Sequence, residues 1–204
     1  MLYGSAVAAS LFCLAGAASA DNILGNLPAA NNNTQSAGLN ASRIKAMSFL
    51  MPGGPGYTLD SVELILSNYD PGEMVTLQIR DDGGGAPGGN ILATFNNPAT
   101  VGGTDVLYTF LPSASFTFMA NTTYWLYVAG DANSTFDWEA ASPGQAPTGI
   151  ATFGLNLFTT NGGTSWTNSS ITNNFQINGT VVPAPGAALA LMGGLGLAGT
   201  RRRR

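Results

Sequence analysis

The sequence predicts an all-β protein built as a single β-sandwich of the jelly-roll type, and three observations favour this fold. Apolar and polar residues alternate along several short segments, which is the period of a strand with one buried face. Gly, Pro, Asn and Asp separate these segments, with turn signals about every 8 to 15 residues. Residues 21–182 show no comparable helical periodicity.

The clearest predicted strand covers residues 73–80, where Val75, Leu77 and Ile79 alternate with polar neighbours. Residues 57–66 show a similar alternation with one change of phase. Further short strands are expected at residues 91–95, 105–110, 122–130, 135–140, 149–158 and 175–182.

The ends of the chain differ in composition from its middle, so we divide it into four parts. Residues 1–20 are expected to be a signal peptide, and residues 21–45, rich in Asn, Ala and Gly, a flexible leader. Residues 46–182 form the predicted sandwich. Residues 183–204 form a separate C-terminal signal.

The charges of the chain are unevenly placed. The sequence has 7 basic and 11 acidic residues and no histidine. Only Arg43, Lys45 and Arg80 are basic outside the C-terminal tail, so residues 21–182 carry three basic residues against eleven acidic ones, a net charge of −8. Such a surface repels phosphate backbones, and we expect no nucleic-acid partner. Without histidine, the commonest general base and zinc ligand is missing.

The N-terminus has the features of a secretory signal. An apolar stretch at residues 6–17 precedes Ala18, Ser19 and Ala20, the small-x-small pattern that signal peptidase accepts, so Asp21 would begin the mature chain. An N-terminal membrane helix is the alternative. Cys13 is the only cysteine, so the mature chain would contain no disulfide.

The C-terminus combines two prolines, a short apolar run and four arginines. Residues 186–200 would span about 22 Å as a helix, a marginal length for crossing a membrane. Four basic residues, Arg201, Arg202, Arg203 and Arg204, would stay cytoplasmic and stop transfer. Pro183 and Pro185 prevent the helix from continuing outward.

This layout resembles the PEP-CTERM sorting signal, in a variant whose motif residues are Val182, Pro183, Ala184, Pro185 and Gly186. The acid usual between the prolines of that family is Ala184 here. The resemblance implies processing by an exosortase in a Gram-negative-type bacterium that makes extracellular polysaccharide, with a transient stay in the inner membrane. A permanent single-span anchor is the alternative.

The middle of the chain is similar to the choice-of-anchor R type of extracellular domain, over about residues 46–180. The similarity lies in "GYTLDSVELIL", "VTLQIRDDGGGAPGGNILATF", "FTFMANTTYWLYVAG", "STFDWEAAS", "GTSW" and "NNFQINGT". It implies a secreted, surface-attached protein and brings no catalytic residues with it.

Two acidic groups invite sharper interpretations. Asp81, Asp82 and Asn90 occur in "RDDGGGAPGGN", a glycine-rich stretch that suits either a hairpin turn or a calcium site. The second group, Asp131, Asp137 and Glu139, could serve glycoside hydrolysis only if the carboxylates lay at suitable separations. We favour the turn and solvated carboxylates, and therefore expect no bound metal, no cofactor and no enzyme activity.

Three tryptophans are candidates for stacking against sugar rings: Trp125, Trp138 and Trp166. Aromatic residues of this kind also supply core burial in a β-domain, which is the competing interpretation. The sequence thus favours an exported structural or adhesive protein of the cell surface, extracellular matrix or biofilm, with signal peptidase and exosortase as processing partners. A carbohydrate-binding module with a discrete aromatic site is the alternative, and extracellular polysaccharide is the expected partner in both cases.

Overall fold

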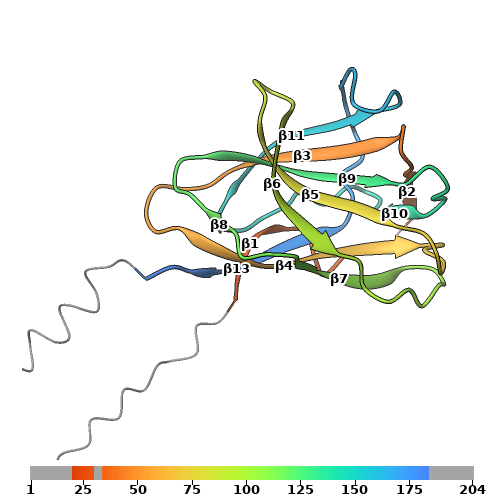
Figure 1. Cartoon of the computed structure of the whole chain (residues 1–204), viewed down its shortest axis with the longest axis horizontal. Helices are drawn as coiled ribbons and strands as arrows, with labels where there is room; N and C mark the ends of the chain where they lie inside the picture. Colours follow the sequence, from red (N-terminus) through yellow and green to blue (C-terminus); the bar gives the residue numbers. More distant parts are fainter. Residues whose placement is uncertain (1–19, 30–33, 184–204) are drawn as a thin grey trace, which may run out of the picture.

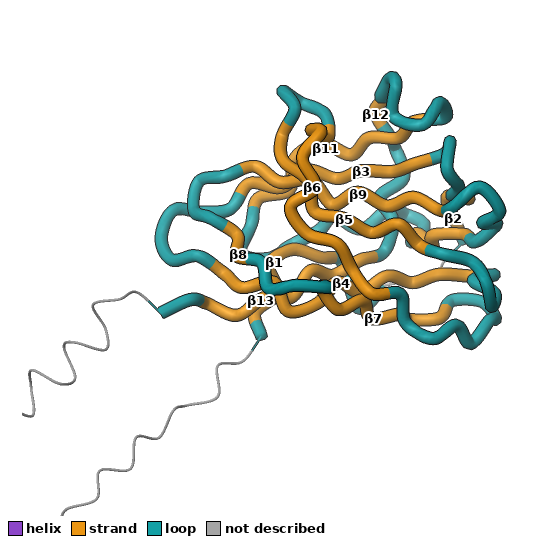
Figure 2. Tube along the Cα trace, in the orientation of Figure 1, coloured by secondary structure: helices purple, strands orange, loops and turns teal. Residues whose placement is uncertain are grey.

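The computed structural model describes residues 20–29 and 34–183, and these residues form strands and loops (Figures 1 and 2). The all-β prediction is confirmed. The strands are β1 (Asp21–Gly25), β2 (Gln35–Gly38), β3 (Ile44–Leu50), β4 (Tyr57–Ser67), β5 (Val75–Asp82), β6 (Pro87–Asn96), β7 (Val106–Pro112), β8 (Thr117–Phe118), β9 (Thr123–Gly130), β10 (Asp137–Ala140), β11 (Thr152–Thr159), β12 (Thr167–Asn168) and β13 (Phe175–Val181).

The strands belong to one antiparallel sheet that curls strongly into a half-barrel. The upper half in Figure 1 has the order β6-β5-β9-β3-β11-β12, and the lower half has the order β1-β13-β4-β7. Strands β6 and β7 join the halves through the pairs Phe95↔Pro112 and Asn96↔Leu111. β10 extends the lower half beside β4, and β2 pairs with β10. The side opposite the β6–β7 junction is the open side of the curl.

The main core fills the space between the two halves. Met47, Leu126 and Ile79 face it from the upper half, and Leu64 and Ile177 face it from the lower half. Aromatic rings close both ends of this core. One group contains Phe49, Phe116, Phe118 and Tyr124, and the other contains Tyr69, Tyr108 and Phe136.

Strands of the upper half differ in how many faces they bury. β5 alternates between buried and partly exposed residues, as the sequence pattern predicted. In contrast, β3 is buried at every position from Ile44 to Phe49, and β9 at every position from Tyr124 to Gly130. Their outer face is covered by Ala86 from the β5–β6 hairpin and by Trp166. A second, smaller apolar layer therefore lies outside the sheet.

The prediction of a flexible leader over residues 21–45 is wrong for most of that stretch. Ile23 and Leu24 are fully buried in the main core, and β1 pairs with β13. β2 and the first residues of β3 also fall within this stretch. Ile23 and Leu24 form a short apolar segment among Asn, Ala and Gly, so local composition hides a strand that long-range pairing stabilises.

Asn26 fixes the chain after β1. It is buried, its side-chain oxygen accepts from the Phe175 amide at 2.9 Å, and its Nδ2 donates to the Asn173 carbonyl at 3.1 Å. The Asn26 amide also donates to the Phe175 carbonyl. These hydrogen bonds continue the connection to the chain before β13 at the point where β1 ends. The segment that contains β1 and Asn26 is therefore part of the fold.

The two ends of the described domain lie together. Asp21 is opposite Gly179 in the β1–β13 pair, and both strands lie at the lower left of Figure 1. β13 begins at Phe175, about 20 Å from Val181 at the usual rise per residue. The opposite end of the domain carries β2 and the β11–β12 hairpin.

If β1 is integral to the core, Ile23→Ala should lower the free energy of unfolding by about 2–4 kcal/mol, because it leaves a cavity beneath β13. Chemical denaturation of the full chain measures this. Val101→Ala, at an exposed loop position, is the control and should change stability by less than about 0.5 kcal/mol. If both substitutions changed the free energy of unfolding by the same small amount, the result would contradict a core role for β1 and support a flexible leader.

Candidate functional site

Two of the three tryptophans predicted to stack against sugar rings are buried in the structure. Trp125 and Trp138 each have 0% of their surface exposed. Trp138 packs in the main core, and its indole N–H donates to the Asn174 carbonyl at 2.9 Å. Trp125 faces outward from β9, but Ala86 and Trp166 cover it. Neither ring has a free face, so stacking against a sugar by these two residues was a wrong prediction.

Trp166 remains partly exposed and belongs to an aromatic cluster on the outer face of the upper half. Its ring meets Tyr127 edge to face, with centroids 6.3 Å apart. The guanidinium carbon of Arg80 lies 3.8 Å from the Tyr127 ring centre, a cation–π contact. We call Arg80, Tyr127 and Trp166 the aromatic site. Burial raises the pKa of the Tyr127 hydroxyl, and nearby Arg80 opposes this shift.

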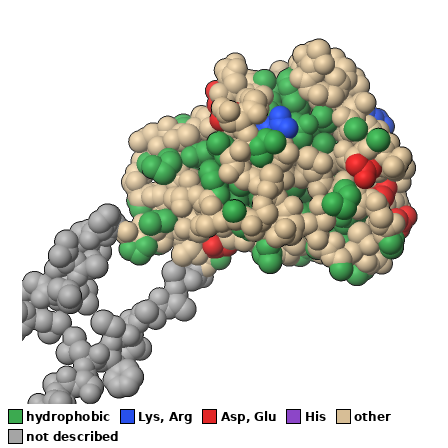
Figure 3. All heavy atoms as spheres, viewed as in Figure 1, with side chains coloured by type: hydrophobic (Ala, Val, Ile, Leu, Met, Phe, Trp, Pro, Cys, Tyr) green, Lys and Arg blue, Asp and Glu red, His purple; other side chains and the backbone are tan. Residues whose placement is uncertain are grey.

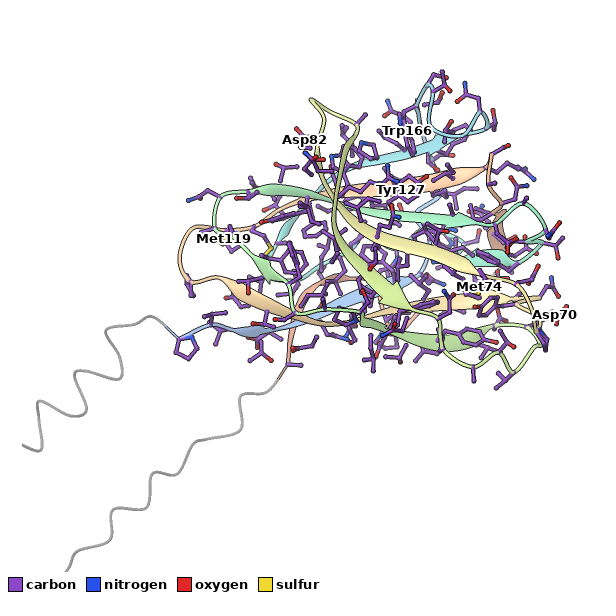
Figure 4. All side chains as sticks on the ribbon, in the orientation of Figure 1. Asp70, Met74, Asp82, Met119, Tyr127 and Trp166 are labelled. Carbon is purple, nitrogen blue, oxygen red and sulfur yellow. The ribbon has the colours of Figure 1, made fainter. Side chains whose placement is uncertain are left out.

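The aromatic site lies between two projecting loops. Figure 3 shows apolar side chains and basic side-chain atoms gathered in a hollow between the projections on this face. Figure 4 shows Tyr127 and Trp166 near each other, with Asp82 on the neighbouring hairpin. Gln78 of β5 is opposite Tyr127 of β9, and Arg80 lies two residues further along β5, so it is on the same face as Tyr127. This neighbourhood follows from the β5–β9 register and not from the alternation within either strand.

The residues of the calcium candidate are used to shape a hairpin. The Asp81 carboxylate accepts from the Asn90 amide at 3.1 Å and from the Asn90 side chain at 2.5 Å. Asp82 accepts from the Trp125 indole at 2.8 Å and from the Gly85 amide at 3.2 Å. The indole hydrogen bond is the main cause of the lowered pKa of Asp82. These bonds favour the hairpin-turn interpretation.

The second acidic group does not form a paired-carboxylate site. Asp131 caps its own loop, and the Asn133 amide is the main cause of its lowered pKa. Asp137 accepts from Ser36 and Asn68. Glu139 is buried, and desolvation raises its pKa. Among residues 20–29 and 34–183, no three His, Cys, Asp or Glu side chains are grouped to hold a metal ion.

A pocket of about 350 Å³ opens on the open side of the curled sheet, between β2 and the β11–β12 hairpin. Its lining combines apolar residues with polar ones, and Arg43 and Lys45 both contribute to it. Both residues were noted for their charge, but no site was predicted at either of them. The available signal was Lys45 itself, the only lysine of the chain, placed inside the apolar segment "IKAMSFL".

Lys45 is a buried cation, with 3% of its surface exposed. Its Nζ donates to the Ile171 carbonyl at 2.5 Å and to the Ser169 hydroxyl at 3.0 Å. Burial lowers the pKa of the Lys45 ammonium from its ordinary value of 10.5 to about 7, because low-dielectric surroundings disfavour the charged form. The amine of Lys45 can thus gain or lose its proton near neutral pH.

The predicted sorting motif is only partly within the described residues. Val182 donates its amide to the Gly56 carbonyl, and Pro183 is exposed. Ala184, Pro185, Gly186, Arg201, Arg202, Arg203 and Arg204 lie outside the described residues, as do residues 1–19 of the predicted signal peptide. Where the chain is described, no helix is long and apolar enough to span a membrane.

No protein-family model matches this chain, and no curated protein is similar to it in sequence.

The lowered pKa of Lys45 predicts a pH dependence of stability. Between about pH 7 and pH 9.5 the unfolded chain keeps the Lys45 proton and the folded chain has released it. Raising the pH in this range therefore favours the folded state, and the free energy of unfolding should increase by about 2 kcal/mol or more. Denaturant titrations at several pH values measure the slope.

Lys45→Met is the control for this slope, because it keeps an unbranched side chain and removes the titrating group. Its free energy of unfolding should change less with pH than that of the natural chain. Tyr69 and Tyr127, whose pKa values burial raises, ionise at higher pH in both proteins. Parallel pH profiles for the two proteins would contradict the buried, titrating amine.

Proposed function

We propose that this chain is an exported bacterial protein of the cell surface or extracellular matrix, trimmed by signal peptidase and by an exosortase. Its β-domain has a structural or adhesive role linked to extracellular polysaccharide. The three-part tail carries the sorting part of this proposal: Pro183 and Pro185, the apolar run 186–200 and the arginines 201–204.

The observation that best supports display at a surface is the pairing of β1 with β13. Asp21, the expected first residue after signal cleavage, is also the first residue of β1 and lies opposite Gly179. Both expected processing points therefore adjoin one edge of the domain. A chain held at that edge presents the end with the pocket, about 20 Å away along β13, to its surroundings.

We infer a jelly-roll-like sandwich, since the two halves of the curled sheet face each other across one core. The antiparallel pairing and the single junction at β6–β7 support this description.

The tail hypothesis predicts different fates for two sets of variants. Replacing all four arginines (Arg201→Ser, Arg202→Ser, Arg203→Ser and Arg204→Ser) should release an uncleaved, longer protein, because the short apolar run holds the membrane weakly without fixed charges. Pro183→Ala with Pro185→Ala should leave an uncut protein in the membrane. Cell fractionation and intact-mass spectrometry distinguish these products. Normally trimmed, surface-attached protein from both variants would contradict an exosortase signal.

A carbohydrate-binding module is a second candidate function, supported by the aromatic site. A partly exposed indole beside a tyrosine can contact the apolar face of a sugar ring, and Arg80 can donate hydrogen bonds to its hydroxyls. Only Trp166 of the three predicted tryptophans contributes to this site.

For this second function, Trp166→Ala should weaken binding to the glycans that the natural chain recognises by about tenfold, since stacking area is lost. A glycan array followed by titration of the best ligand measures this. Leu107→Ala, at an exposed position of β7, should bind like the natural chain. Unchanged binding by Trp166→Ala would exclude the aromatic site as the sugar contact.

A further inference from the structure

The basic residues of the domain are concentrated in one place. Residues 21–182 contain only three, and two of them, Arg43 and Lys45, line the pocket on the open side of the sheet. The third, Arg80, lies over Tyr127 on the outer face of the upper half. In a stretch with a net charge of −8, two cations in one pocket form a local site for a negative group.

The ammonium of Lys45 is held in a fixed position by the segment that follows β12. Its two hydrogen bonds go to Ser169 and Ile171, and the Ser169 hydroxyl itself bonds the Ile171 carbonyl at 3.1 Å. An ammonium has three N–H donors, so one donor remains for a ligand. Among the residues that the structure describes, both partners of the Lys45 ammonium are uncharged, and it forms no salt bridge.

A buried charge without a partner destabilises a folded protein, and an anion bound beside it supplies the missing compensation. The pocket also excludes much of the solvent around the amine, which strengthens a direct charge–charge contact. A bound anion would therefore favour the protonated form of Lys45 and be held by it.

Arg43 approaches the same pocket from the loop between β2 and β3. The Asn40 side chain accepts from the Ser42 and Arg43 amides, both at 2.9 Å, in an Asx-type turn that orients the loop. The Arg43 guanidinium forms no hydrogen bond with the residues described by the structure. It is therefore available for a two-pronged contact with a carboxylate.

Asp137 is an acidic group close to Arg43 at this rim. Oδ1 of Asp137 and Nη1 of Arg43 both lie close to Gly38. A Cβ added to this glycine would be 3.3 Å from the oxygen and 3.7 Å from the nitrogen. The Asp137 carboxylate is bonded to Ser36 at 3.4 Å and to Asn68 at 3.2 Å. Asp137 does not line the pocket, so the lining residues carry two cations and no carboxylate.

The remaining lining suits a ligand rich in hydroxyl groups. It includes the hydroxyls of Ser36, Thr160 and Ser170, which can donate or accept hydrogen bonds, and the amide of Asn168. Phe158, 36% exposed, adds an apolar ring. A volume of about 350 Å³ lies within the range of small-ligand pockets, about 300–1,000 Å³.

We propose that this pocket binds an acidic sugar residue, with its carboxylate between Lys45 and Arg43, its hydroxyls on the Ser, Thr and Asn side chains, and its apolar face beside Phe158. A hexuronic acid combines these three chemical features in one ring. The inference deepens the proposed function by naming a ligand class, and it rests on that function only for the source of the sugar.

The test is isothermal titration of the full chain in detergent with trigalacturonate, with galactotriose as the uncharged counterpart and inorganic sulfate as a bare anion. Trigalacturonate should bind with a saturable, salt-sensitive isotherm, and galactotriose and sulfate at least about tenfold more weakly. Lys45→Met and Arg43→Ala should each weaken trigalacturonate binding by about tenfold or more. Thr104→Glu, in the loop before β7, changes the net charge by the same amount as Lys45→Met and should stay within about twofold of the natural chain.

Three results would overturn the proposal: no trigalacturonate binding, equal binding of galactotriose or sulfate, or unchanged binding by Lys45→Met. Lys45→Met removes a buried charge, so we expect it to fold, and its circular dichroism spectrum checks this. If trigalacturonate does not bind, the proposal that an exosortase processes the tail is unaffected. If the tail is not processed in cells, the binding of trigalacturonate is still expected.

Discussion

The burial of β3 and β9 on both faces is the constraint on which the rest of the structure depends. The inner faces of these strands meet the lower half of the sheet, and their outer faces meet Ala86 and Trp166. An upper half with a bare outer face would leave Trp125 in solvent. Because the outer cover comes from the β5–β6 hairpin and from the chain beside β12, those two segments are held in place by packing, and they frame the aromatic site.

The same two strands connect the candidate binding surfaces. Tyr127 of β9 points outward to Arg80 and Trp166, whereas Lys45 of β3 points inward to the pocket beside β2. The pocket lies at the end of the domain where β13 begins, at Phe175. Both ends of the described domain leave the fold at the other end of β13, where Asp21 is opposite Gly179. A domain attached through that edge keeps the pocket turned away from its attachment, which suits a surface or matrix protein.

Much of the fold could be predicted from local patterns, and the exceptions have a common physical cause. Val75, Leu77 and Ile79 alternate with polar residues because β5 buries mainly one face. β3 lacks this alternation because both faces are buried, and β1 is too short to stand out from the Asn-rich stretch around it. The sequence could not distinguish buried Trp125 from partly exposed Trp166, since the exposure of each ring depends on which hairpin covers which face of the sheet. Lys45 was visible as a lysine in an apolar segment, but its burial depends on the distant residues Ser169 and Ile171.

The most direct measurement is a pH titration of Lys45 by NMR in the full chain labelled at lysine with ¹³C and ¹⁵N. Since the chain has one lysine, its side chain gives a single, assigned signal. The structure predicts a pKa of about 7 in the free protein, and trigalacturonate should raise this pKa because the bound carboxylate stabilises the ammonium. A pKa near the ordinary value of 10.5 in the free protein, unchanged by the ligand, would contradict the buried cation and the site built around it.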